Sequence, residues 1–449
     1  MSRFTIVLIV MAATFSTTMT TTLNAAEKLN GTSHDGWSFT SARAETAPQS
    51  SVRAEGNAYG LVITGTGDAI ADGRWVKRVA LPGGEYVRFS ARYRANNIEM
   101  TARNVVVGIA WLDEKGNATG NTEHPATTSP AAAADGWRRV DQTFKVPPKA
   151  KQAQIELRLR WSPRGEVEFR DARLTAAAQP TPRKVKVASV NHRPRGLKSA
   201  QENLDSFSKY IEEAGAAKAD IICLPEAMTL IGRGSDYLAS AETIPGPSTE
   251  FLGKLAAKHK SYIVAGLLER EGKAAYNTSV LIDRDGKLVG KYRKICLPRS
   301  EYDGGLAPGS EYPVFETDFG KVAMMICWDV SYPEIARELA HRGAEMILMP
   351  IWGGNETLCK ARAIENQVPL VISSYDLRSA IYDQAGEAMA IAKDTSSCVV
   401  YADLNLAEPM NWKWSGNWRD RIWLEGPVRP DAATAAAATP TASKASAAD

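Results

Sequence analysis

Residues 320–350 read GKVAMMICWDVSYPEIARELAHRGAEMILMP, and this stretch decides the fold class. Val322–Ile326 is a short apolar run, Pro333–Arg342 has the spacing of an amphipathic helix, and Met346–Met349 is a second apolar run. A strand, a helix and a second strand in this order predict a sheet covered by helices. Cys327 stands where the first strand gives way to a polar turn, so it is either a nucleophile or a small buried side chain.

The same alternation continues on both sides of this stretch. Further strands are predicted at Val185–Val190, Asp220–Pro225, Ser261–Gly266 and Leu370–Ser373, and on both sides of the Asp285-Gly286 turn. Further helices are predicted at 197–214, from a Ser248 cap through about His259, and near 357–367. Residues 184–430 are therefore predicted to form one α/β layered domain.

Residues 27–178 show a different residue pattern, typical of short strands. Tyr86–Tyr93 and Ala153–Trp161 alternate with period two, and turn signals such as Asp135-Gly136 separate the short runs. This pattern predicts an all-β sandwich. Its order of strands resembles the jelly-roll modules that bind carbohydrate in exported enzymes, so a glycan is the ligand that the resemblance implies. Two interpretations stay open for its aromatic residues, which could stack on sugar or lie in the core: Trp75, Trp111 and Trp161.

The two ends and the junction have distinct compositions. Residues 1–26 combine Arg3, a short apolar run and small residues, as in a signal peptide, and this predicts export to the periplasm or the medium. The alternative is an uncleaved amphipathic N-terminus. Residues 179–183 are predicted to be a linker. The Ala-, Thr- and Ser-rich residues 431–449 are predicted to be a disordered tail.

Composition excludes several classes of protein. The formal net charge is +3, from 54 basic and 51 acidic side chains, which gives no reason to propose a nucleic acid or an anionic membrane as partner. No segment after the N-terminus is long and apolar enough to predict a membrane span. The 5 cysteines are odd in number and form no CxxC pair, so they predict isolated thiols and no disulfide framework. No Cys/His cluster predicts a metal site.

Three polar residues follow or interrupt apolar strands of the α/β domain: Glu226, Lys294 and Cys327. Active sites in α/β folds lie at the ends of strands and in the loops after them. A carboxylate can take the proton of a thiol, and the resulting thiolate is the attacking species. A lysine can hold that thiolate and then the oxyanion of a tetrahedral intermediate. These residues therefore predict nucleophilic catalysis by cysteine.

The order of four motifs supports this interpretation. The chain resembles the nitrilase superfamily of carbon–nitrogen hydrolases over residues 184–430, and the likeness is carried by ADIICLPEAM around Glu226, GKYRKICLP around Lys294, the stretch around Cys327, and ARAIENQVPLVISS from Ala361 to Ser374. The resemblance implies a Glu226–Lys294–Cys327 triad and a further glutamate, Glu301, that positions substrate and lysine. The chain departs from the family at Cys296, where it reads KICLP and family members commonly have an HLP pattern. This departure leaves the subfamily open.

The resemblance also implies a fold, an assembly and a reaction. The fold is a four-layer αββα sandwich, and the assembly is a homodimer paired through helices, for which the stripe of Ile335 and Leu339 is suitable. The reaction is hydrolysis of a small amide, N-carbamoyl compound or nitrile through an acyl-enzyme, with no metal or organic cofactor. The backbone N–H of Trp328 is expected to join Lys294 at the oxyanion.

Several alternatives stay open. Trp352 lines the substrate pocket or belongs to the core. Asp329 and Arg362 are predicted to make structural ion pairs around the active-site loops. A Trp-Asp pair after the nucleophile resembles amidase and carbamoyl hydrolase members more than nitrilases. The second candidate function is an inactive exported binding protein whose sandwich holds a glycan.

Overall fold

The computed structural model describes residues 33–56, 58–125, 134–408, 411–412 and 416–426. The predicted signal peptide and tail lie outside these residues. Two compact units divide after Gln179, and the second runs from Pro180 to Trp423. None of the helices in the described ranges has the length and apolar character needed to cross a membrane.

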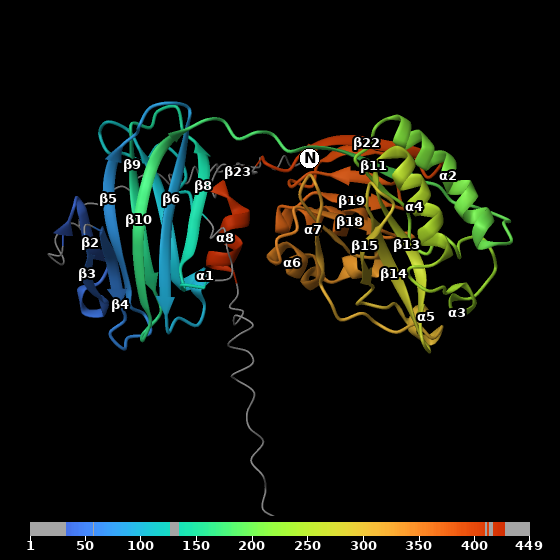
Figure 1. Ribbon diagram of the computed structural model, residues 1–449, viewed down its shortest axis with the longest axis horizontal. Coiled ribbons are helices and arrows are strands. Elements are labelled where there is room, and N and C mark those ends of the chain that lie inside the picture. The colour runs from blue at the N-terminus through green and yellow to red at the C-terminus, as the bar shows by residue number, and fades with distance from the viewer. Residues whose placement is uncertain (1–32, 57, 126–133, 409–410, 413–415, 427–449) are drawn as a thin grey trace, which may run out of the picture. The chain divides into compact units, whose positions relative to one another are not determined.

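The first unit contains two five-stranded antiparallel sheets (Figure 1). One has the order β1 (Ser33–His34), β2 (Trp37–Ser41), β5 (Asp72–Ala80), β9 (Gln152–Arg160) and β7 (Val105–Leu112). The other has the order β3 (Gln49–Glu55), β4 (Ala58–Thr64), β10 (Glu166–Ala177), β6 (Tyr86–Asn96) and β8 (Arg138–Lys145). A short helix, α1 (Thr101–Asn104), precedes β7. Side chains of period two from both sheets fill one core, as in a β-sandwich.

Of the two interpretations left open for these tryptophans, a core position is the right one for Trp75 and Trp111. Trp75 and Trp111 are 0% exposed and belong to the core of the sandwich. Trp161 is 41% exposed, but the guanidinium groups of Arg103 and Arg160 lie 5.0 and 4.2 Å from the centre of its ring.

The second unit contains two six-stranded sheets. The first has the order β15 (Leu288–Arg293), β14 (Ala274–Ile282), β13 (Tyr262–Glu271), β12 (Ile221–Cys223), β11 (Lys184–Asn191) and β22 (Cys398–Asn405). The second has the order β16 (Val314–Glu316), β17 (Lys321–Met324), β18 (Met346–Pro350), β19 (Leu370–Ser373), β20 (Ala380–Tyr382) and β21 (Ala388–Ile391). The neighbours β11, β12 and β13 are parallel, and so are β17, β18 and β19.

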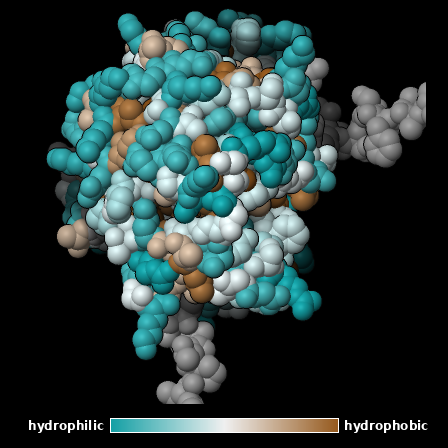
Figure 2. Space-filling view, turned by 90° about the vertical axis from the view of Figure 1, so that its right-hand side faces the viewer, coloured by the Kyte–Doolittle hydropathy of each residue, from teal (hydrophilic) through white to brown (hydrophobic). Residues whose placement is uncertain are grey.

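Helices cover the outer face of each sheet, which gives the four layers αββα (Figure 1). The first sheet packs against α2 (Ala200–Ala216) and α4 (Pro247–His259), and the second against α6 (Pro333–His341) and α7 (Glu356–Asn366). Figure 2 looks onto the side with α2 and α4, where the surface is mostly hydrophilic and apolar residues form small scattered groups. The fold predicted from the sequence is confirmed.

The remaining elements are short: α3 (Tyr237–Ser240), α5 (Arg299–Asp303), the 3-10 helix η3 (Cys327–Ser331), β23 (Asn411–Trp412), β24 (Gly416–Asn417) and α8 (Trp418–Glu425).

Two local predictions need correction. Ser248 does not cap α4, because the helix begins at Pro247 after Gly246, and the Ser248 N–H donates to the Glu242 carboxylate. Proline is favoured at this first position since its missing N–H would have no partner there. Ile335 and Leu339 are 2% and 0% exposed and pack on their own sheet, so they cannot form a dimer contact.

Candidate active site

Three predicted catalytic side chains come together at the ends of strands. Glu226 follows β12, Lys294 follows β15 directly, and Cys327 follows β17 as the first residue of η3. The Nζ atom of Lys294 lies 2.8 Å from Oε1 of Glu226, and the Cys327 thiol interacts with both groups. These residues, far apart along the chain, are thus grouped, and β12 and β17 are each an inner strand of one of the two six-stranded sheets.

Contacts on both oxygens hold the Glu226 carboxylate. Oε1 accepts hydrogen bonds from Lys294 Nζ and from Asn277 Nδ2 at 2.7 Å, and Oε2 accepts from the backbone N–H of Trp352 at 2.9 Å. The Glu226 carbonyl accepts from the Tyr375 hydroxyl at 2.8 Å. The Glu226 residue is 2% exposed, and the charged Lys294 ammonium is among its partners. A fixed carboxylate is thus placed beside the thiol.

Gly266 of β13 allows Glu226 to lie where it does. A Cβ atom at position 266 would lie 2.5 Å from the Glu226 Cα and 2.8 Å from the Pro225 carbonyl oxygen. Both atoms belong to the backbone, so neither can rotate away. A glycine is therefore required behind the carboxylate.

Lys294 lies between two carboxylates. Its Nζ atom is 2.5 Å from Glu301 Oε1 as well as 2.8 Å from Glu226, and the side chain is 0% exposed. Burial lowers the pKa of Lys294, but the negative charges of the neighbouring carboxylates, Glu226 and Glu301, help to outweigh burial and raise it above its usual value. The ammonium group therefore keeps its proton throughout the working pH range.

Glu301 completes this cluster from α5. Burial raises its pKa and the charge of Glu226 adds to that effect, while attraction to Lys294 opposes both. The Asn277 amide also donates to Glu301 Oε2 at 3.2 Å, so one NH₂ group joins the two carboxylates. Asn277 was not predicted. Its signal was present in the run Asn277–Ser279, three polar residues inside a strand that is otherwise apolar and buried.

Cys327 has an unusual backbone. Its φ is 42°, in the left-handed region that residues other than glycine rarely adopt, and such strain concentrates at functional sites. The thiol lies 3.8 Å from the Gly353 carbonyl oxygen. Burial raises its pKa and the charge of Glu226 raises it further, while Lys294 lowers it. The resting sulfur is therefore a thiol, and a thiolate forms when its proton is passed on.

Asp329 does not make the predicted ion pair. Its 0% exposed carboxylate accepts hydrogen bonds from the Tyr292 hydroxyl and from the N–H groups of Cys296 and Ile326. Burial raises the pKa of Asp329 to about 6, against the lowering effect of these donors. Arg362, in contrast, does pair with Glu365 at 2.8 Å.

The two predicted tryptophans both follow Cys327 in the chain, Trp328 directly and Trp352 after β18. Trp328 is 44% exposed in the first turn of η3. Trp352 is half-buried; it packs on the core of the first sheet, with its ring 5.4 Å from that of Tyr375. The Arg193 guanidinium lies 5.8 Å from the centre of the Trp352 ring and pairs with Asp376. An ion pair therefore lies beside Trp352, whose backbone N–H holds the Glu226 carboxylate.

Metal ligands are not grouped in the described part of the chain. No set of three or more His, Cys, Asp or Glu side chains there is arranged to hold a metal ion.

Comparisons with known proteins agree with this geometry. The family model described as carbon-nitrogen hydrolase matches residues 186–413. A probable nitrilase of Schizosaccharomyces pombe is 31% identical over 263 residues, which cover 53% of this chain and 96% of the relative. A citrullinase of Francisella tularensis is 30% identical and an omega-amidase of Homo sapiens is 29% identical. The alignments cover 49% and 46% of this chain, and 90% and 83% of those relatives.

The matched segment includes Glu226, Lys294 and Cys327 and lies within the four-layer unit. The predicted membership of the nitrilase superfamily is thereby confirmed. The chain belongs to the carbon–nitrogen hydrolase family and is a hydrolase of carbon–nitrogen bonds other than peptide bonds.

Proposed function

We propose that this enzyme hydrolyses a small amide or N-carbamoyl compound through a thioester on Cys327. The observation that carries the proposal is the placement of Lys294 between Glu226 and Glu301, with the Cys327 thiol beside Glu226 and Lys294. This arrangement supplies a base, an oxyanion partner and a nucleophile in one buried cluster.

The first half of the reaction forms the acyl-enzyme. Glu226 takes the proton of Cys327, and the thiolate attacks the carbonyl carbon. The oxyanion is stabilised by Lys294 Nζ and the backbone N–H of Trp328, and one such donor typically accounts for about 10²–10³ in turnover. Protonated Glu226 then gives its proton to the leaving amine as the carbon–nitrogen bond breaks. Glu301 fixes Lys294 and orients the substrate.

The second half releases the acid. Glu226, again ionised, takes a proton from water, and the resulting hydroxide attacks the thioester carbonyl. The same donors stabilise the second tetrahedral intermediate. When the carbon–sulfur bond breaks, the proton on Glu226 returns to the Cys327 sulfur. An N-carbamoyl substrate follows the same steps through a carbamoyl thioester.

Several observations bear on the substrate. The relatives named above include a citrullinase and an omega-amidase, which supports carbamoyl and amide compounds equally. The Arg193–Asp376 ion pair beside Trp352 adds a polar edge that suits a substrate with a charged end. Nitriles remain a third class to test, because the triad would serve them as well.

The test is a screen for ammonia release from amides, carbamoyl compounds and nitriles, with intact-mass detection of an acyl adduct. We expect amides or carbamoyl compounds to be hydrolysed, the adduct to map to Cys327, and chelators to have no effect. Cys327→Ala should keep the fold and abolish turnover. Hydrolysis retained in that variant would refute the covalent route.

The second candidate, an inactive glycan-binding protein, is disfavoured because the cluster is complete. Turnover in the screen above decides between the two.

Homodimer formation and export also remain proposals from the sequence. Trp328 and Tyr332 are 44% and 43% exposed and offer apolar surface for self-association, which sedimentation at micromolar concentration tests. Fractionation of the native host tests export.

A further inference from the structure

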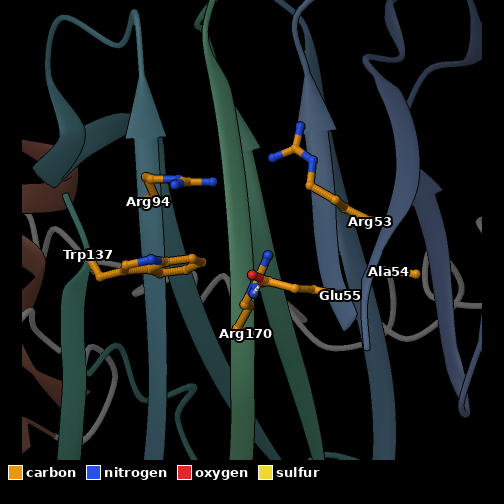
Figure 3. A pocket seen from close by; sticks show the side chains of 6 residues that line it. All are labelled: Arg53, Ala54, Glu55, Arg94, Trp137 and Arg170. Carbon is orange, nitrogen blue, oxygen red and sulfur yellow. Dashed lines mark hydrogen bonds and ion pairs between the residues drawn. The ribbon is translucent and has the colours of Figure 1, made fainter. Parts of the chain in front are cut away.

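The β-sandwich carries a cavity on the outward face of the sheet β3–β4–β10–β6–β8 (Figure 3). The cavity has a volume of about 240 Å³ and is lined by Arg53, Ala54, Glu55, Arg94, Trp137 and Arg170. Along β10, Val167 and Phe169 face the core, so the intervening Glu168 and Arg170 face outward.

The floor of this cavity is a buried carboxylate that holds three guanidinium groups. Glu168 is 1% exposed, although it lies on the outward face. Its carboxylate accepts from Arg53 at 2.5 Å, from Arg94 at 3.1 Å and from Arg170 at 2.6 Å. Each guanidinium has five N–H donors, so a single carboxylate cannot satisfy all three groups. Donors remain for another anion above the floor.

The Trp137 ring packs against two of these arginines, Arg94 and Arg170, and against the neighbouring Arg92. The guanidinium carbons of Arg92, Arg94 and Arg170 lie 4.8, 5.1 and 5.1 Å from the centre of the indole ring. Figure 3 shows Arg94 over the ring and Arg170 beyond the edge of the ring. Since cations already cover it, the indole is a support for guanidinium groups and not an open platform for sugar.

A carboxylate already lies at the opening. Glu55 pairs with Arg170 and is 68% exposed, whereas Arg170 is 9% exposed. An ion pair with one such exposed partner contributes little and is readily exchanged. Glu55 therefore marks the position of a ligand carboxylate, which can replace it. Among the lining residues, Glu55 is the one acid beside three arginines, while Glu168 contacts all three from below and Glu166 pairs with Arg53 at 3.2 Å.

From this geometry we infer that the sandwich binds a small carboxylic acid of about one sugar ring, such as a uronic acid. Its carboxylate lies between Arg53, Arg94 and Arg170 in place of Glu55. Guanidinium groups match a planar carboxylate through paired hydrogen bonds. The volume limits the remainder of the ligand to about the size of a monosaccharide. This site is independent of the proposed hydrolase reaction.

The test is calorimetric titration of the full chain with glucuronate, with glucose as the neutral match and acetate and sulfate as partial matches. We expect glucuronate to bind with a dissociation constant of about 1 mM or below, that is about −4 kcal/mol or stronger. Glucose should not bind, and acetate and sulfate should bind more weakly than glucuronate.

Two substitutions should act in opposite directions. Arg94→Gln should weaken binding by about 10-fold or more, because it removes a charged hydrogen-bond donor. Glu55→Gln should strengthen binding by about 3-fold, because it removes the competing carboxylate. Arg88→Gln is the matched control, since Arg88 lies on the same strand and pairs with Asp141 away from the cavity. It should bind like the parent.

Four results would overturn the inference: no binding of glucuronate, equal binding of glucose, weaker binding by Glu55→Gln, or sulfate binding as tightly as glucuronate. Acetate as tight as glucuronate would refute the sugar-sized part of it. Structural damage alone cannot produce a gain in Glu55→Gln together with a loss in Arg94→Gln.

Discussion

The carboxylate of Asp329 accepts a hydrogen bond from the backbone N–H of Cys296 at 2.8 Å. Cys296 lies two residues after Lys294, and Asp329 lies two residues after Cys327. The other carboxylate oxygen accepts from the Ile326 N–H at 2.9 Å, just before the nucleophile. One buried side chain therefore joins the segment that carries the lysine to the turn that carries the thiol, and sets the distance between them.

Asp329→Asn should disturb both segments. An asparagine presents one acceptor and one NH₂ group, so at least one buried N–H donor loses its partner, at a cost of about 1–3 kcal/mol. We expect the free energy of unfolding to fall by that amount and kcat to fall by about 10-fold or more, because small misplacements are costly in catalysis. Denaturant titration and steady-state kinetics measure both. Asp303→Asn, at an exposed ion pair with Arg299, is the control; an unchanged Asp329→Asn enzyme would contradict the coupling.

Asn277 should act as a positioning residue for the two carboxylates. Asn277→Asp places a third acidic group in contact with Glu226 and Glu301, and like charges oppose ionisation. We expect kcat/KM to fall by about 10² and the acid side of the pH–rate profile to move to higher pH. Asn277→Ala should move it in the same direction by less. If both variants lose activity with no movement of the profile, the role is structural only.

Iodoacetamide should label Cys327, although the pKa of this thiol is not low. Burial and Glu226 raise the pKa of this thiol, so the labelling rate should keep rising through pH 8–9 with no plateau. Glu226→Gln should speed labelling at pH 8–9, because it removes a negative charge that raises the pKa of the Cys327 thiol. Cys223 and Cys359 are 0% exposed and should stay unlabelled. Peptide mapping separates Cys327 from half-buried Cys296, and label confined to Cys296 would count against the proposed nucleophile.

His192 should make the hydrolase unit sensitive to acid. Its ring nitrogens lie 2.9 Å from the Ser397 hydroxyl and 3.2 Å from the Ser206 hydroxyl. Burial lowers the pKa of His192 to about 4, from an ordinary value near 6.5. The unfolded chain therefore binds the proton first, so stability is intact above about pH 6.5 and is lost as the pH falls towards 4.

His192→Gln provides the comparison for that prediction, because glutamine keeps hydrogen-bonding capacity and does not titrate. Unfolding midpoints in urea, measured from pH 7 to pH 4, should fall more steeply for the parent than for the variant. Parallel curves would show that His192 is not responsible.

Much of the hydrolase unit could be predicted from the sequence because its signals are local. The strand before Cys327 and the helix after it are each readable from apolar spacing, and the helix α7 was placed within one residue at either end. The meeting of Glu226, Lys294 and Cys327 was predictable because each of them follows or interrupts an apolar run.

The contacts that hold the site were not predictable in the same way. The Asn277 amide donates to two glutamates that lie outside its own strand, one after β12 and one in α5, and only the fold reveals this. Asp329 is predicted from the sequence to make an ion pair, yet two backbone N–H groups and the Tyr292 hydroxyl satisfy its carboxylate. The cavity of the sandwich requires Arg53, Arg94 and Arg170 to meet from three different strands, and Glu55 and Arg170, which pair there, are 115 residues apart along the chain.

At position 327, the left-handed backbone makes thermal stability and the proposed catalytic role favour different residues. Glycine adopts a φ of 42° freely, whereas another residue in such a conformation costs on the order of 1 kcal/mol. Selection of this protein for thermal stability alone would therefore favour Cys327→Gly, which removes the proposed nucleophile. Any directed-evolution campaign on this scaffold has to select for turnover in every round.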